Sequence, residues 1–147
     1  MFESGKFSSA EINFIVHATE DETKLLHAIK EVLAITTISF SPTYFEGHFG
    51  NKILLLSAAL TAEGALTLSS KIFSSLNNID RNQLSNYLQE YADENGNLYI
   101  RLDKQKIVRH NLALGGSDPL RIKFRAVRLF KPYQNLQNYR GGLPSAE

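Results

Sequence analysis

Cationic and apolar side chains alternate without a break from residue 120 to residue 126. Arg121, Lys123 and Arg125 take every second position, and apolar residues fill the positions between them. Every second side chain of a β-strand points to the same face, so these cations would stand on one face at intervals of roughly 6.6 Å. A guanidinium can hold a phosphate through two parallel hydrogen bonds. The spacing therefore predicts a ladder of cations that suits a polyanion such as RNA.

A second group of candidate residues lies in and after the alternating segment 98–103. Tyr99 and Arg101 share its polar face, where the Tyr99 ring offers a surface on which a nucleobase can stack. Lys104, Lys106 and Arg109 follow directly. We expect them to extend the ladder into one basic patch if the two strands are neighbours in the sheet.

The loop 45–52 brings further candidates. Burying Phe45 or Phe49 is worth up to about 3 kcal/mol each, so we expect at least one of them to pack against the sheet and order the loop. The loop would then adjoin the basic face, with His48 and Lys52 pointing outward as further RNA-binding residues. Alternatively, His48 only bonds to Glu46 or to backbone within the turn.

Catalytic and metal-binding patterns are weak. There is no cysteine, which excludes disulfides, thiolate catalysis and cysteine-bound metal centres. Glu46 and His48 could form an acid-base pair, but we expect them to fix the loop by hydrogen bonds. Six metal-capable side chains show no recognised ligand spacing, so we expect no metal and no cofactor. They are His17, Glu20, Asp21, His27, His48 and His110.

The net charge of +1 hides an asymmetry along the chain. Residues 1–100 carry 6 Lys and Arg against 12 Asp and Glu, whereas residues 101–147 carry 10 against 3. A basic region of this kind points to a polyanionic partner. Two alternatives stay open: acidic helices pack over a sheet whose basic strand neutralises them, or the charges keep an exposed strand from aggregating.

The elements that must position these residues can be read from hydrophobic periodicity. Alternating or β-branched segments predict strands, and apolar stripes at helical spacing predict helices starting near Thr19, Ala62 and Asp80. Pro42 should end the second strand, and the third, the most apolar, should be central and covered on both faces. The predicted strands are 11–18, 35–40, 53–60, 98–103 and 120–127.

These elements predict one α+β domain over residues 1–147. We expect a five-stranded, mainly antiparallel sheet with helices packed on one face and the basic strands on the open face. The ordered core should run from about residue 9 to residue 131. The tail 132–147 should be partly mobile, with Tyr133 and Tyr139 anchoring a short helix.

Three segments of the chain resemble a known family. They are EGHFGN at 46–51, HATEDE at 17–22 and LYIRLDKQ at 98–105. Together they resemble an archaeal family of predicted RNA-binding, exosome-associated proteins, over about residues 11–130. The resemblance implies an α+β fold similar to the large-subunit ribosomal protein that binds 5S rRNA. It implies no catalytic residues.

From the basic segments and the resemblance we expect a non-enzymatic RNA-binding accessory protein of RNA processing or ribosome metabolism. Its partners would be rRNA or another structured RNA, with a protein complex of RNA processing as a further partner. The chain has no signal pattern and no apolar run of transmembrane length, so we expect a cytoplasmic protein. The alternative is a protein-interaction module whose basic patch docks an acidic subunit, because carboxylates attract arginine as phosphates do.

Overall fold

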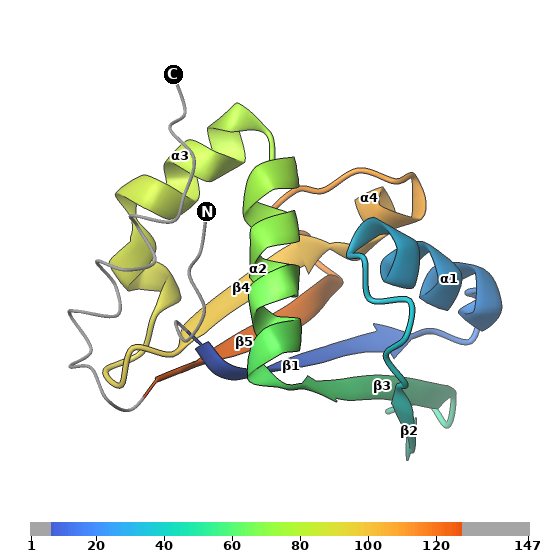
Figure 1. Ribbon diagram of the computed structural model, residues 1–147. Helices are drawn as coiled ribbons and strands as arrows, with labels where there is room; N and C mark the ends of the chain where they lie inside the picture. The colour runs from blue at the N-terminus through green and yellow to red at the C-terminus, as the bar shows by residue number, and fades with distance from the viewer. Residues whose placement is uncertain (1–6, 128–147) are drawn as a thin grey trace.

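In the described part of the chain, a five-stranded antiparallel sheet forms one layer, and four α-helices cover one face of this sheet (Figure 1). The computed structural model describes residues 7–127. The strands are β1 (Phe7–Val16), β2 (Ser41–Glu46), β3 (Lys52–Leu60), β4 (Leu98–Asp103) and β5 (Pro119–Ala126), in the spatial order β2-β3-β1-β5-β4. The helices are α1 (Glu22–Val32), α2 (Ala62–Ser75), α3 (Asn78–Asn86) and α4 (Lys104–Val108), with a 3-10 helix, η1 (Leu88–Tyr91). The predicted α+β architecture is confirmed.

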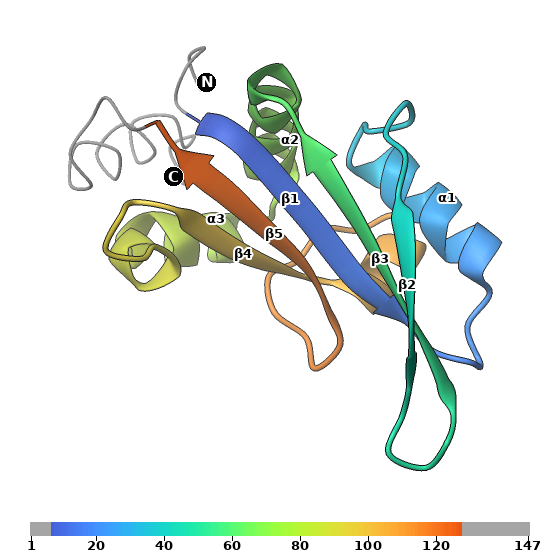
Figure 2. The ribbon, with the colours of Figure 1, turned by 90° about the horizontal axis from the view of Figure 1, so that it is seen from below.

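The core lies between the sheet and the helices. Along β1, Ile12, Phe14 and Val16 are buried while the residues between them are only partly covered, as the alternation of side chains in a strand requires. Helix α2 packs over β1 and β3 and buries Leu68 and Ile72 against them. Within residues 7–127, no helix lies on the opposite face of the sheet (Figure 2).

The second strand was predicted in the wrong place. The segment 35–40 is a connection whose Phe40 ring packs against Phe14, with ring centres 5.5 Å apart, and the strand itself is β2, which contains Pro42. Proline is tolerated because β2 is an edge strand, where an amide facing outward has no partner to lose. Strand β3 is not central either. It lies between β2 and β1, so the central strand is β1.

Polar caps set the starts of α1 and α4, which differ from the prediction, whereas α2 begins at Ala62 as predicted. Helix α1 begins at Glu22 because Asp21, rather than Thr19, accepts the amide hydrogen bond of the first turn, from Lys24 at 3.1 Å. Helix α4 was not predicted. The Asp103 carboxylate caps it by accepting hydrogen bonds from the Gln105 and Lys106 amides at 3.0 and 3.2 Å. The chain therefore turns off the sheet directly after β4.

Some expectations fall outside the described part of the chain. The tail 132–147 and the short helix predicted near Tyr133 and Tyr139 lie beyond residue 127. Between residues 7 and 127, no helix combines the length and the hydrophobicity that crossing a membrane requires.

The loop after α4 forms hydrogen bonds along the outer edge of β4. The Gly115 amide donates to the Arg101 carbonyl, and the Asp103 amide donates to the Ala113 carbonyl, both at 2.9 Å. Gly115 and Gly116 both have positive φ, 97° and 96°, which disfavours any residue with a Cβ. Only Gly116 is also crowded, because a Cβ there would lie 3.3 Å from the Asp103 Cα, whereas nothing lies within 4 Å at Gly115.

This difference gives a matched pair of variants. Gly116→Ala should lower the free energy of unfolding by about 1–3 kcal/mol, because backbone strain adds to a contact with immobile backbone. Gly115→Ala introduces backbone strain alone, so it should lower the free energy of unfolding by only about 1 kcal/mol. Chemical denaturation of both variants measures the difference, and equal losses would show that the loop does not press on β4 at Gly116.

Candidate nucleic-acid interface

The predicted ladder of cations stands on the open face of the sheet. Strands β4 and β5 are neighbours, and their exposed polar side chains alternate with the buried side chains that face the helices. The neighbouring strand widens the set. From here on, the ladder means the cations Arg101, Arg121, Lys123 and Arg125 together with Tyr99. The prediction that the basic strands occupy the open face is therefore confirmed.

Arg101 and Arg121 form one end of the ladder. They are directly opposed on the two strands, and both are exposed. Directly opposed like charges destabilise a sheet. Among residues 7–127, no carboxylate forms an ion pair with either guanidinium. The pair therefore presents two unneutralised positive charges side by side.

The remaining cations of the ladder have partners. Arg125 Nη2 lies 3.1 Å from Glu11 Oε1, on β1. Lys123 Nζ lies 5.4 Å from the centre of the Tyr99 ring, within the range of a cation–π interaction. The Tyr99 hydroxyl donates to Asp93 Oδ2 at 2.9 Å, which holds the ring over the face.

Asp93 is a stable anchor for that ring. Burial opposes ionisation of its carboxyl group, but hydrogen bonds from Asn97, Tyr99 and the amide of Asn95 outweigh this effect. They hold the pKa of Asp93 below its ordinary value of 3.8, so the carboxylate stays charged at neutral pH.

A shallow hollow of about 370 Å³ lies in the middle of the ladder. Its polar lining residues are Glu11, Asn13, Tyr99, Arg101, Arg121 and Lys123. Asn13 adds an amide group to the cations, since it is the β1 partner of Arg121. The hollow thus offers several hydrogen-bond donors and one carboxylate, Glu11, which Arg125 already neutralises. It fits an anionic ligand.

The expectation that Lys104 belongs to this patch is wrong. Its side chain is fully buried, at 0% exposure. Its ammonium donates to the Ile15 carbonyl, to Glu20 Oε1 at 2.9 Å and to Asp118 Oδ2 at 2.6 Å. A buried ammonium must be paired in this way, which leaves it unavailable to a ligand.

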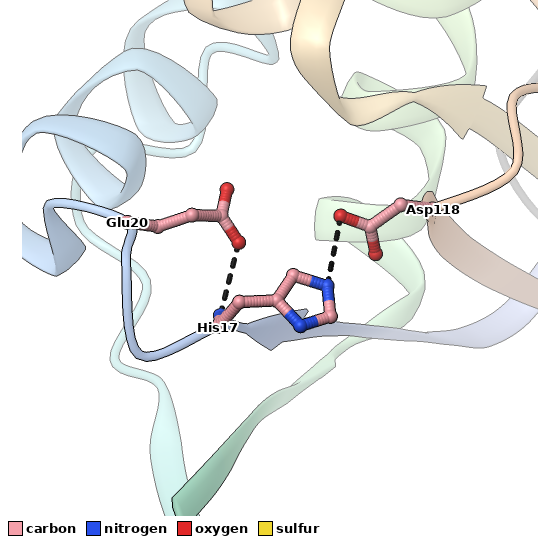
Figure 3. Close-up of side chains that lie close together, drawn as sticks. All are labelled: His17, Glu20 and Asp118. Atoms are coloured by element: carbon pink, nitrogen blue, oxygen red, sulfur yellow. Dashed lines mark hydrogen bonds and ion pairs between the residues drawn. The ribbon is translucent and has the colours of Figure 1, made fainter. Parts of the chain in front are cut away.

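The carboxylates around Lys104 form a cluster with His17 (Figure 3). His17 Nε2 lies 3.2 Å from Asp118 Oδ2, and the His17 amide donates to Glu20 Oε1 at 2.9 Å. Ligand atoms of the three side chains lie within 4.8 Å of one another, close enough for a metal ion. However, the Lys104 ammonium already contacts both carboxylates, and a divalent cation here would face a buried positive charge. The cluster suits an ion-pair network better than a metal.

Glu20 shows the effect of that network. Burial opposes its ionisation, but the hydrogen bond from the His17 amide and the ammonium of Lys104 outweigh burial, so its pKa lies below its ordinary value of 4.5. Sequence reasoning missed the network because Glu20 and Lys104 are 84 residues apart. Both lie in segments that carry the family resemblance, HATEDE and LYIRLDKQ, but the resemblance implied no contact between them.

Lys106 and Arg109 do not extend the ladder either. Helix α4 carries them to the helical side, where they line a separate groove of about 730 Å³ with Lys71 and Glu31. The cause is the turn at the Asp103 cap, which takes the chain off the sheet. Cations near the C-terminal end of a helix also offset its dipole.

His48 and Lys52 lie on the β2–β3 hairpin, at the edge of the sheet opposite β4 (Figure 2). The expectation that this loop adjoins the basic strands is wrong, because β1 and β3 intervene. The expected anchoring is also wrong, since Phe45 is 51% and Phe49 91% exposed. Backbone hydrogen bonds hold the turn instead, from the Gly47 amide to the Asn51 carbonyl and from Gly50 back to Gly47.

The Lys104 network can be tested by Lys104→Met, which leaves Glu20 and Asp118 close together without a cation. We expect a loss of about 3–5 kcal/mol in the free energy of unfolding at pH 7. Lys106→Met, an exposed lysine of the same helix, should change stability by no more than about 0.5 kcal/mol.

The same variants have different pH profiles. A depressed carboxyl pKa stabilises the fold above the ordinary value and loses that contribution as pH falls through the folded value. The wild type should thus lose stability below about pH 4.5 as Glu20 is protonated. Lys104→Met should lose less over that range, and parallel acid profiles would contradict the network.

Comparisons with known proteins place the chain in a family. A family model described as RNA binding matches residues 9–126. RNA-binding protein PAB1135 of Pyrococcus abyssi is 30% identical over 120 residues, which are 78% of each chain. The crystal structure of protein AF2318 from Archaeoglobus fulgidus matches with a TM-score of 0.78 and 26% identity, over 92% of this chain and 99% of that one. Mth689, a DUF54 protein from Methanothermobacter thermautotrophicus, matches with a TM-score of 0.76 and 25% identity, over 94% and 98%. The chain therefore belongs to the protein family described as RNA binding.

Proposed function

We propose that this protein binds RNA by holding backbone phosphates on the ladder. The observation that carries the proposal is the opposed pair Arg101 and Arg121. Two like charges that repel in the free protein become favourable once a phosphate lies between them, since each guanidinium can donate two hydrogen bonds to it.

The other groups of the face supply contacts of different kinds. Lys123 and Asn13 add donors beside the arginines, and the Tyr99 ring offers a stacking surface for one base. Phosphate contacts carry little sequence information. Recognition therefore favours the shape and backbone of the RNA over a short sequence motif.

Family membership supports RNA as the partner, and PAB1135 is named as an RNA-binding protein. A non-enzymatic role in the cytoplasm, in RNA processing or ribosome metabolism, is part of the proposal. So are an association with the exosome and a likeness to the 5S-rRNA-binding ribosomal protein, which rest on the sequence resemblance. Glu46 and His48 lie on an exposed hairpin, which supports a role other than acid-base catalysis.

The test is the double variant Arg101→Ala, Arg121→Ala. It should weaken binding to a structured RNA and lower the steepness of log affinity against log salt by about one, because the one phosphate held between the two guanidiniums is no longer bound. The same variant should be at least as stable as the wild type, because a repulsion of about 0.2–1 kcal/mol is relieved. Fluorescence anisotropy at several salt concentrations and chemical denaturation provide the two readouts.

The matched control is Lys24→Ala, Lys30→Ala, which removes the same charge from α1 on the covered side. It should leave the slope close to that of the wild type. Unchanged RNA binding in the arginine variant would remove the proposed site. If a pull-down recovers no RNA and its protein partners survive ribonuclease, the face docks an acidic protein instead.

A further inference from the structure

The open face of the sheet has a second half of different character. In the strand register, Ile15 on β1 lies opposite Leu55 on β3, and Ile53 on β3 lies opposite Phe45 on β2. These four side chains lie on the same face as Asn13, the partner of Arg121. The three aliphatic side chains are only half-buried, so an apolar strip runs from the ladder towards the β2–β3 hairpin.

Exposed aromatic rings continue this strip on the hairpin. Phe45 is 51% exposed and Phe49 91% exposed, which is unusual for large apolar side chains. Phe49 and His48 pack edge to face, with ring centres 5.0 Å apart. The hairpin extends beyond the ends of the other strands (Figure 2). An exposed phenylalanine lacks most of the free energy that burial would provide, so a partner that covers the ring gains this free energy on binding.

The turn that carries Phe49 has a defined geometry. The Gly47 amide donates to the Asn51 carbonyl at 2.6 Å, and the Gly50 amide donates to the Gly47 carbonyl at 2.9 Å. Gly50 has a φ of 78°, which glycine adopts without strain. A ring held on such a turn loses little conformational entropy on binding, which favours it as a recognition element.

From these observations we infer that the β2–β3 hairpin stacks unpaired RNA bases, with Phe49 as the principal ring. The inference rests on the proposed function, because the strip is continuous with the phosphate-binding ladder. An RNA strand has phosphates on one side and aromatic bases on the other, and this face is divided in the same way.

The chemistry of the hairpin favours bases over a second copy of the chain. Its exposed large side chains are aromatic rings, and every nucleobase offers a π-face on which such rings stack. Tyr44 and Phe45 point to opposite sides of β2, so the aromatic surface does not form the single flat patch that a two-fold interface needs.

The experiment uses the full chain with two RNA probes of equal charge. One is a single-stranded RNA carrying the fluorescent base 2-aminopurine, and the other is a fully paired RNA duplex. Phe49→Ala should bind the single strand roughly 5- to 150-fold more weakly, the range for losing one stacked base. Binding to the duplex should be unchanged, and the quenching of 2-aminopurine seen with the wild type should disappear. Phe49→Trp should retain both.

The matched control is Ile79→Ala, which removes another strongly exposed apolar side chain, 80% exposed, from α3. It should bind both probes like the wild type. If Phe49→Ala binds the single strand normally while Arg101→Ala, Arg121→Ala weakens it, the inference fails and the proposed function stands. If neither variant changes RNA binding, both fail. Equal weakening on both probes, or a dimer lost in Phe49→Ala with RNA affinity unchanged, would also overturn base stacking.

Discussion

The buried ammonium of Lys104 is the interaction on which the arrangement of this sheet depends. It contacts the Ile15 carbonyl near the end of β1, Glu20 before α1, and Asp118 at the start of β5, while its own backbone begins α4. An ammonium removed from water is tolerated only when it is fully paired, so these segments must meet at one point.

Strand register divides the open face between two kinds of side chain. Strands β4 and β5 carry the cations, and β1 and β3 carry Ile15, Leu55 and Ile53 towards the hairpin. Each half of the face contains a feature that lowers the stability of the free protein. The arginines repel each other, and Phe49 stays in water. Both costs are recovered when a ligand with anionic and aromatic sides covers the face, which is the physical basis of the proposed function.

Local alternation is the part of this structure that the sequence predicts well. The segment 120–126 has period two, so β5 and its cations could be assigned to the open face before their neighbours were known. Lys104 could not be placed, because its partner Glu20 lies 84 residues away and a lysine is ordinarily exposed. Lys106 and Arg109 were misplaced because the Asp103 cap starts α4. The hairpin was misplaced because the position of β2 depends on strand order, which no local pattern encodes.

The most direct test of RNA binding on the open face is amide chemical-shift mapping of the full chain titrated with RNA. The account predicts the largest changes at Tyr99, Arg101 and Arg121, with further changes along β3 towards the hairpin. Residues of α1 and α2, on the covered side, should change little. If the amides of the open face do not respond and the changes are confined to the groove around Arg109 on the helical side, RNA does not bind to the open face.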